Sequence, residues 1–327
     1  MHQVLRNIWR SAVVLALSLA FPGVLPALAQ ESWPTKPIRL IVPFAAGGNT
    51  DTIARLVAER LTTSLPATIV IENIPGGGGV VATQTVARAT ADGSTLMLAA
   101  TPQLAIVPRL QQVSFDPIKD FQPIKNIAFN PFVLVVHKSV PAANLKELLD
   151  WGRSNPGKLT YGSGGQGGVS HLSSALLFAK AGISATHVAY RGNAPAQADV
   201  VAGHIPMIFS NLSDALTQAN NPDVRLLAVS STRRSQLLPD VLTVSEQGMA
   251  GFDTVAWNGL VAPAGLPAAI LARLEKEIAD YVRLPATRAR FADLGLEPDN
   301  GTSSDFAGRI RADITAWAEA IKLAGIK

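Results

Sequence analysis

Short apolar segments alternate with amphipathic segments along most of the chain. The apolar segments are rich in β-branched residues, which is typical of buried strands, whereas the amphipathic segments repeat their apolar positions with helical spacing. In residues 50–64, for example, Ile53, Leu56, Val57 and Leu61 share one helical face. Strands are predicted at 38–44, 67–73, 95–100, 132–138, 158–163, 186–190, 205–210, 224–230 and 254–263. Helices are predicted at 50–64, 80–91, 144–155, 169–182, 194–203 and 211–219. The alternation predicts an α/β protein with parallel sheets covered by helices on both faces.

The end of the chain departs from this pattern, because residues from Pro267 onward predict helices almost without interruption. Their apolar stripes need a sheet that is built earlier in the chain. The simplest arrangement has the chain leave a first domain near 130–138, build a second domain, and return near 254–263. We therefore expect two doubly wound domains joined by two crossing strands, with domain 1 formed by 30–135 plus 258–327 and domain 2 by 136–257. Ligands of such sheets bind beyond the carboxyl ends of the strands, here in the cleft between the domains.

The first residues resemble a targeting segment. Arg6 and Arg10 precede an apolar run at 11–20, and Ala27-Leu28-Ala29 supplies the small residues that a signal peptidase needs. The run is shorter than the ~20 residues that cross a bilayer, which argues against a membrane anchor. We expect a cleavable signal peptide over 1–29, cleavage between Ala29 and Gln30, and export to the periplasm.

Charge and cysteine content exclude several classes of function. Without residues 1–29, which hold two of the 28 basic residues and no acid, the chain has 26 basic and 24 acidic residues, a formal charge of +2. A nearly neutral surface without basic runs argues against nucleic-acid binding. The absence of cysteine excludes thiol nucleophiles and cysteine metal sites.

Three glycine-rich turns connect a strand to a helix. Gly47-Gly48 precedes the first helix, "ENIPGGGGVV" at 72–81 precedes the second, and "YGSGGQGGVSHL" at 161–172 follows a later strand. Such turns present free backbone N–H groups and the positive end of a helix dipole at one place, which favours an anion. Charge-assisted bonds from two or three N–H groups, at about 1.5–3 kcal/mol each, are sufficient to hold a carboxylate.

Motifs for chemistry are weak by comparison. Gly162, Gly164 and Gly167 form G-x-G-x-x-G, but the next strand lacks the acid that would hold a ribose. Neither of the two later glycine turns carries a P-loop lysine, no serine lies in G-x-S-x-G, and no histidine pair has ligand spacing. We expect no catalytic residue, no metal and no cofactor.

Polar residues follow several other strands. Arg191 and Asn193 lie between a strand and a helix, where Arg191 suits either a cleft cation or a surface ion pair. Neutral groups at several strand ends suit a hydrogen-bonding pocket better than a reaction centre. The further residues in such positions are Thr101, Gln103, Asn211 and Asp214.

The sequence resembles the substrate-binding components of tripartite tricarboxylate transporters, also called Bug-type solute receptors. The resemblance runs through "WPTKPIRLIVPFAAGGNTDTIARLVAERL" (33–61), "VIENIPGGGGVVATQTVARATADGSTLMLA" (70–99), "SFDPIKDFQPI" (114–124) and "VPAANLKELLDWGRSNPGKLTYGSGGQGGVSHLSSALLF" (140–178). It continues through "THVAYRGNAPAQADVVAGHIPMIFSN" (186–211), "LLPDVLTVSEQG" (237–248) and "WNGLVAPAGLP" (257–267). It implies a periplasmic binding protein of the Venus flytrap type II architecture, which closes on a small carboxylate and serves a membrane permease.

In the family, the first glycine turn and the later Gly/Ser turn clamp the carboxylate, and these map to residues 44–50 and 163–171. Together with the strand ends, the candidate ligand-binding residues are Phe44, Ala46, Gly47, Gly48, Asn49, Thr50, Asp51, Gly78, Thr101, Gln103, Ser163, Gly164, Gln166, Gly168, Ser170, His171, Arg191, Asn193, Asn211 and Asp214.

The sequence departs from the family pattern at the distal wall of the cleft. Ile74 replaces a frequent arginine, and the segments at 80–84 and 101–108 are more apolar than is usual in the family. This favours an aromatic or short aliphatic acid over a polycarboxylate.

Two other functions use the same residues. A periplasmic sensor that signals to a membrane partner without transport needs the same closing cleft. An enzyme acting on a small acid is disfavoured by the missing nucleophile, metal and acid–base sets. We expect a monomer that binds no nucleic acid.

Overall fold

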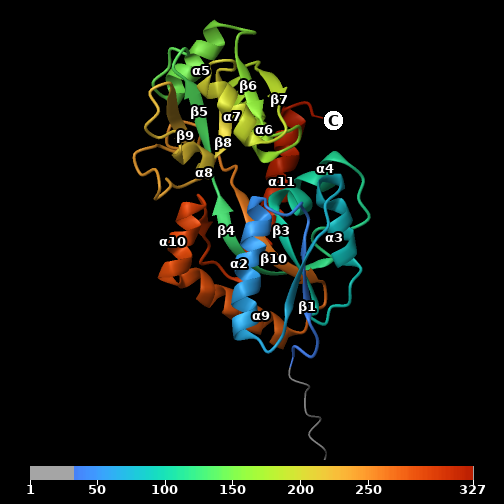
Figure 1. Cartoon of the computed structure of the whole chain (residues 1–327). Helices are drawn as coiled ribbons and strands as arrows, with labels where there is room; N and C mark the ends of the chain where they lie inside the picture. The colour runs from blue at the N-terminus through green and yellow to red at the C-terminus, as the bar shows by residue number, and fades with distance from the viewer. Residues whose placement is uncertain (1–32, 327) are drawn as a thin grey trace, which may run out of the picture. The chain divides into compact units, whose positions relative to one another are not determined.

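The computed structural model describes residues 33–326. The predicted signal peptide and its cleavage site fall outside the described residues. The chain from Lys36 onward is one unit that contains two β-sheets (Figure 1).

The first sheet has six strands in the order β11-β4-β10-β3-β1-β2. β1 runs parallel to both β2 and β3, whereas β10 is antiparallel to β3 and β4. The strands are β1 (Ile38–Val42), β2 (Ile69–Asn73), β3 (Thr95–Ala100), β4 (Phe121–Asn130), β10 (Ala256–Pro263) and β11 (Glu297–Pro298).

The second sheet has five strands in the order β7-β6-β8-β5-β9. β6 is parallel to β7 and β8, and β5 is antiparallel to β8 and β9. The strands are β5 (Phe132–His137), β6 (Thr160–Ser163), β7 (Thr186–Ala189), β8 (Met207–Asn211) and β9 (Val224–Val229).

Helices cover both faces of each sheet. They are α2 (Asn49–Ser64), α3 (Val80–Ala87), α4 (Val107–Leu110), α5 (Leu145–Ser154), α6 (Val169–Ala181), α7 (Asn193–Val201), α8 (Leu212–Leu216), α9 (Ala268–Arg283), α10 (Pro285–Asp293) and α11 (Ser303–Leu323). A short 3₁₀ turn, η1 (Gly77–Gly79), and a π-helical turn, η2 (Pro102–Ile106), complete the set.

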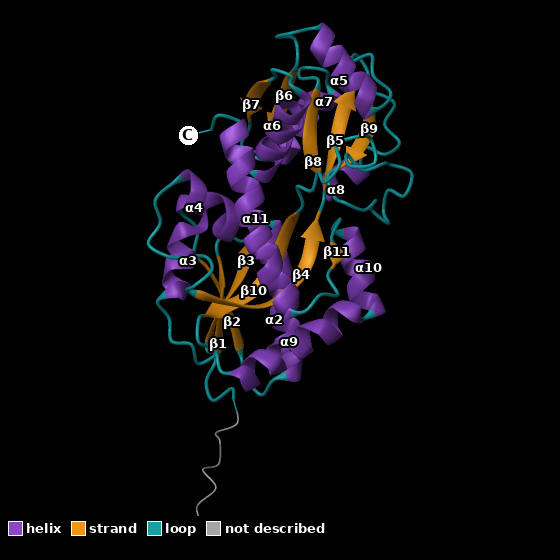
Figure 2. Cartoon of the chain, turned by 180° about the vertical axis from the view of Figure 1, so that it is seen from behind, coloured by secondary structure: helices purple, strands orange, loops and turns teal. Residues whose placement is uncertain are grey.

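Alternation along the strands explains these layers, since successive side chains point to opposite faces. In the first sheet, Ile41 and Met97 pack with Val86 of α3 and Trp317 of α11 in one apolar cluster. α2 contacts β1 and β2 and packs against α9. α2 lies in front of the sheet in Figure 1, and α11 lies in front of it in the reversed view of Figure 2.

The chain crosses between the sheets twice, as expected from the sequence. β4 of the first sheet ends at Asn130, and β5 of the second sheet begins at Phe132, with Pro131 between them. Proline has no N–H to donate to a ladder, so it ends one strand while the backbone stays extended. The chain returns through Thr254 and Val255 into β10.

α11 adds a third connection between the two halves. It packs against β4 and η2 on the first sheet and against α6 on the second. The helical end of the chain thus joins the sheet formed before it, which is the arrangement that its apolar stripe predicts.

Several sequence expectations need correction. The sheets are mixed, not parallel, because the crossing strands β4, β5 and β10 run against their neighbours. β4 was not predicted, since Pro123, Lys125 and Asn126 interrupt its apolar pattern, although Lys125 and Asn126 are buried. The turn η2, α4 and β11 were also not predicted. The division into domains at 135/136 and 257/258 stays a prediction.

The packing of α11 on β10 is tight at Gly259, and this can be tested. A Cβ at this position would collide with the ring of Phe306, which itself packs edge-on against Trp257 with ring centroids 5.0 Å apart. We expect Gly259→Ala to lower the free energy of unfolding by about 1–3 kcal/mol, because overpacking forces neighbouring groups to move. The measurement is urea denaturation followed by circular dichroism.

Gly308→Ala is the matched control, since Gly308 is exposed in α11 and a Cβ there has no neighbour within 4 Å. It is expected to stabilise the protein by about 0.5–1 kcal/mol. Equal effects of the two substitutions would contradict this account of the interface.

Candidate functional site

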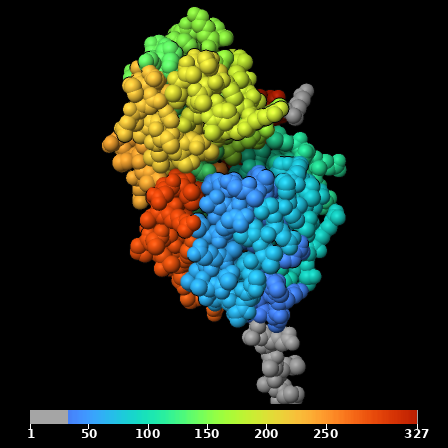
Figure 3. All heavy atoms as spheres, viewed as in Figure 1, coloured from blue at the N-terminus to red at the C-terminus, as the bar shows by residue number. Residues whose placement is uncertain are grey.

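A cavity of about 330 Å³ lies where residues from both sheets meet. Its walls combine loops after β1, β3, β6, β7 and β8 with residues of the crossing strands. In the space-filling view, the blue residues of the first half and the yellow-green residues of the second half border a recess (Figure 3). The lining residues are Phe44, Asn49, Thr50, Ala100, Pro102, Asn130, Phe132, Gly164, Gly168, Val169, Ser170, Gly192, Asn193, Asn211, Ala256, Trp257 and Asn258.

Three helices begin at this cavity. α2, α6 and α7 have glycine N-caps, Gly48, Gly168 and Gly192, and none of the three N-caps carries a side-chain hydrogen bond. The N–H groups in the first turn of each helix are therefore available as hydrogen-bond donors. The positive ends of the three helix dipoles point to the same region. Among the lining residues, the first-turn amides of these helices for which no acceptor is found in residues 33–326 are those of Asn49, Thr50, Val169, Ser170 and Asn193.

No charged side chain lines the cavity. Positive potential therefore comes from backbone N–H groups, and side-chain hydrogen bonding comes from neutral amides and hydroxyls. Such an arrangement binds an anion without a formal cation.

The α6 and α7 turns approach each other closely. The Gly192 N–H donates to the Gly164 carbonyl at 3.1 Å, and a Cβ at Gly164 would lie 2.5 Å from the Asn193 Oδ1. Gly192 also has φ +120°, which side-chain-bearing residues rarely adopt. Glycine at both positions lets two helix N-termini share one wall.

The first glycine turn is held by Asp51. The Gly47 N–H donates to the Asp51 carboxylate at 2.9 Å, and Arg55 and Asn73 donate to the same carboxylate. Burial alone would raise the pKa of Asp51, but these hydrogen bonds outweigh it and lower the pKa to about 2. Asp51 is buried, and neither Gly47 nor Asp51 is among the lining residues; the hydrogen bond between them shapes the turn, and their part in ligand binding stays a prediction.

The predicted residues after β2 and β3 support the cavity wall without lining the cavity. Thr101 is fully buried, and its Oγ1 accepts a hydrogen bond from the backbone N–H of Trp257 at 2.8 Å. Gln103 accepts the Ala100 N–H and donates to the Gly78 carbonyl, at 3.0 and 3.1 Å. Thr101, Gln103 and Gly78 therefore position Ala100 and Pro102, which do line the cavity.

Ser163 and His171 lie in a buried stack beside the third glycine turn. The rings of His171 and His187 lie 3.6 Å apart and nearly parallel, and Tyr161 stacks on both. Ser163 Oγ is 2.6 Å from His187 Nε2 and also binds the backbone of Gly165. The two predicted ligand-binding residues therefore support the turn and do not line the cavity.

The His171 ring is held in one protonation state. Its Nδ1 accepts the Gly167 N–H at 3.0 Å, which requires an imidazole without a proton on that atom. Burial, and secondarily the charge of His187, lowers the pKa of His171 to about 4.

Eight of the predicted residues do line the cavity: Phe44, Asn49, Thr50, Gly164, Gly168, Ser170, Asn193 and Asn211. Ser170 Oγ donates to the Phe209 carbonyl, so only its lone pairs remain available. Ala46, Gly48 and Gln166 are exposed next to the glycine turns and outside the lining set.

Arg191 and Asp214 are the two charged residues predicted near the strand ends of the second sheet. Arg191 is exposed next to the lining residue Gly192, and no carboxylate within the described chain lies at ion-pair distance from it. Asp214 faces Asn211 at 3.4 Å, and burial raises the pKa of its carboxyl group, a rise that the Asn211 hydrogen bond opposes. Neither residue lines the cavity.

Sequence reasoning did not find the contribution of the crossing strands. Asn258 of β10 donates from Nδ2 to Thr50 Oγ1 at 3.0 Å, and Asn130 at the end of β4 has a buried Oδ1 without a partner in the described chain. β4 and β10 pair so that Asn130 lies opposite Ala256. Each of the two segments predicted to cross between the domains contains an asparagine, and this polar residue in an apolar strand was the sequence feature that could have indicated its role.

Binding is the chemistry that this arrangement supports. Among residues 33–326, no group of three or more histidine and carboxylate side chains is placed to hold a metal ion. Within the same range, no helix is long and apolar enough to cross a membrane.

The fold and the cavity are those of a two-domain α/β solute-binding protein. Residues 53–326 match the family model described as tripartite tricarboxylate transporter family receptor, and the chain belongs to this family, TctC. This confirms the resemblance seen in the sequence.

Similar proteins span nearly the whole chain. A UPF0065 protein from the tcbD-tcbE intergenic region of a Pseudomonas species is 33% identical, covering 97% of this chain and 95% of its own. An R. palustris protein solved with adipate is 33% identical with a TM-score of 0.76, covering 90% of this chain and 99% of that chain. MatC from Rhodopseudomonas palustris, solved with bound malate, is 30% identical with a TM-score of 0.72, covering 88% and 100%.

The buried His171 gives an expected pH dependence. Since the pKa is about 4 in the folded chain and about 6.5 in the unfolded chain, the unfolded chain binds more protons between these values. We expect the free energy of unfolding to fall by roughly 2–3 kcal/mol from pH 7 to pH 4 through this group. Urea denaturation at a series of pH values measures the slope.

His171→Gln should flatten that slope, because glutamine has no group that titrates in this range. Parallel pH profiles for the wild type and His171→Gln would show that the stack does not govern acid sensitivity.

Proposed function

We propose that this chain is a periplasmic receptor that captures a small organic carboxylate in the cavity and delivers it to a membrane transporter of the tripartite tricarboxylate type. The observation that carries the proposal is the convergence of three uncapped helix N-termini on a cavity lined by no charged side chain. Adipate and malate, the ligands in two similar structures, are both carboxylates.

Each half of the chain contributes part of the carboxylate site. From the first sheet, the Asn49 and Thr50 amides and the Thr50 hydroxyl donate to the ligand. Asn258 occupies a lone pair of Thr50 Oγ1, which leaves the hydroxyl proton available. From the second sheet, the α6 and α7 amides donate from the opposite side.

Closure around the ligand follows from this division of donors. An anion between the two sets gains hydrogen bonds from both only when the halves approach each other, so binding and closure are coupled. The crossing strands at Pro131 and Thr254–Val255 are the expected hinge between domain 1 (30–135 plus 258–327) and domain 2 (136–257).

The remaining walls are apolar. Phe44, Ala100, Pro102, Phe132 and Ala256 lie around the donors. A hydrocarbon chain or an aromatic ring is favourably buried against such walls, whereas additional carboxylates would lose hydration without new partners. The ligand is therefore an aromatic or short aliphatic acid.

Export to the periplasm through the signal peptide at 1–29 completes the proposal. The receptor acts as a monomer and carries out no turnover. Its partners are the carboxylate and the permease.

Thr50→Val tests the binding site directly. The substitution removes the hydroxyl donor with little change of volume, and a hydrogen bond to a charged group contributes about 1.5–3 kcal/mol. We expect the Kd for adipate, or for another acid that binds in a panel, to increase at least about tenfold. Isothermal titration calorimetry measures it.

Thr315→Val, at an exposed threonine of α11, is the matched control and should bind like the wild type. If no acid binds the wild type and none is retained on purification by native mass spectrometry, the carboxylate proposal fails while the fold assignment stands.

A selectivity series tests the apolar walls. Titrations with adipate, benzoate, malate and citrate are expected to place citrate last, because its extra charges find no cations in the cavity. Tight binding of citrate with no binding of benzoate or adipate would refute the assignment of an apolar acid.

A further inference from the structure

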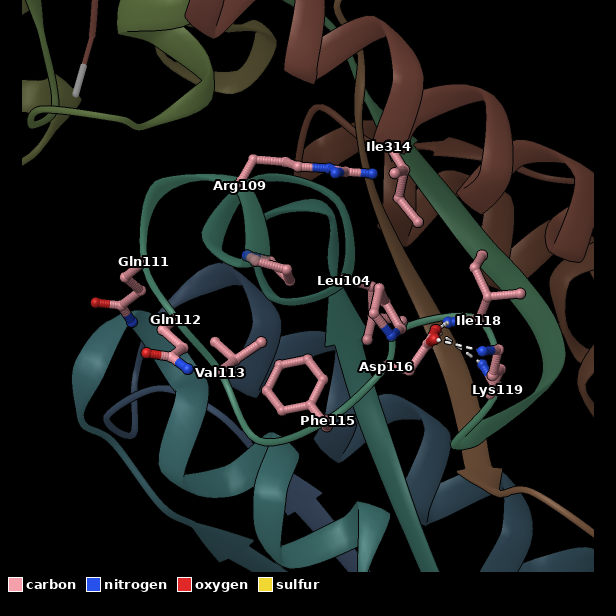
Figure 4. A pocket seen from close by; sticks show the side chains of 12 residues that line it. Leu104, Arg109, Gln111, Gln112, Val113, Phe115, Asp116, Ile118, Lys119 and Ile314 are labelled. Carbon is pink, nitrogen blue, oxygen red and sulfur yellow. Dashed lines mark hydrogen bonds and ion pairs between the residues drawn. The ribbon is translucent and has the colours of Figure 1, made fainter.

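A second groove of about 670 Å³ lies on the first half of the chain, between α4, the loop that follows it and α11 (Figure 4). It shares no lining residue with the carboxylate cavity. The two are nevertheless adjacent along one element, because η2 places Pro102 in the cavity and Leu104 in the groove. π-Helical turns are rare in proteins, and those that occur often lie at functional sites.

The floor of the groove is apolar. Leu104, Phe115 and Ile314 line it from three different elements, and each is at most 9% exposed. Ile118 stands at the rim and is 41% exposed. The volume is within the ~300–1,000 Å³ range of small-molecule sites, which are mostly apolar.

The rim carries positive charge. Arg109 is exposed, its side chain extends over the groove toward Ile314 in Figure 4, and no carboxylate of the described chain lies within ion-pair distance of it. Lys119 lies 3.6 Å from Asp116 and is 82% exposed.

Asp116 offsets the charge of Lys119, its ion-pair partner, so Arg109 is the cation that remains for a ligand. The Asp116 Oδ1 accepts the N–H groups of Ile118 and Lys119, so the carboxylate is used to hold its own loop. The backbone bond from Ile118, the largest contribution, lowers the pKa of Asp116 and keeps it ionised.

We propose that this groove is a second binding site, for a small amphipathic anion such as a medium-chain fatty carboxylate. The apolar floor buries the hydrocarbon body, and Arg109 at the rim pairs with the carboxylate. A purely polar acid gains nothing from the floor, and a neutral alcohol gains nothing from Arg109, so both features are needed for the preference.

The test uses octanoate and 1-octanol as probes of equal chain length. Binding to the full mature chain is followed by saturation-transfer NMR and titration calorimetry. Octanoate could also bind in the carboxylate cavity. Excess adipate, or the substitution Asn193→Trp at that cavity, blocks such binding, so that only binding to the groove is measured. Circular dichroism checks that each variant folds.

We expect octanoate to bind the wild type more tightly than octanol, and Arg109→Ala to weaken octanoate about fivefold while leaving octanol unchanged. Arg109→Lys should retain part of the preference for octanoate over octanol, because lysine keeps the positive charge. Val113→Trp, which fills the groove, should weaken both probes. Arg290→Ala, the same charge change at an exposed arginine elsewhere, should weaken neither.

Equal affinity for octanoate and octanol in the wild type would overturn the proposal. So would octanoate binding that survives both Arg109→Ala and Val113→Trp, or that disappears with Asn193→Trp alone. The carboxylate proposal for the first cavity is unaffected by these results, because it is tested at Thr50.

Discussion

The antiparallel pairing of β4 with β10 is the constraint on which the rest of the structure depends. β10 lies inside the first sheet between β3 and β4, and β4 continues through Pro131 into β5, which lies inside the second sheet. The segment β4–Pro131–β5 therefore contributes a strand to each sheet, and β10 pairs with its first part; these two segments connect the halves. Asn130, Phe132 and Asn258 come from these segments, so the wall of the ligand cavity is part of the connection between the halves.

In the proposed carboxylate site, some polar groups support the turns and others stay available in the cavity. Asp51, Ser163 and His171 accept hydrogen bonds from backbone groups of their own glycine turns. Thr101 and Gln103 accept from the backbone of β10 and β3. Buried polar groups without partners are costly, so satisfying them internally makes the turns rigid. The amides left without partners are then held in place before a ligand arrives, which reduces the entropy cost of binding.

A site built from amides differs in selectivity from a site built from arginine. Helix N-termini supply partial charges at fixed positions, so one carboxylate is well satisfied and a second one finds no strong partner. The apolar walls then decide which acids fit. The groove beside η2 differs from this cavity, because the exposed cation Arg109 lies above an apolar floor, and the single turn of η2 connects the groove to the cavity.

Much of the architecture followed from the sequence alone. Apolar and amphipathic periodicity predicted nine of the strands and the principal helices, the two crossings, and the glycine turns at which α2 and α6 begin, because these features depend on local spacing. The interrupted pattern of β4 concealed a tenth strand, since Lys125 and Asn126 are buried only through tertiary contacts.

The sequence could name polar residues near the strand ends, and only the tertiary structure decided what each one contacts. Thr50 and Asn193 line the cavity, whereas Asp51 and His171, a few positions or less from lining residues, turn inward to bind Gly47 and Gly167. Asn130 and Asn258 reach the site from strands far apart in the chain. Hydrogen-bond partners and cavity walls are set by three-dimensional packing, which one-dimensional spacing does not determine.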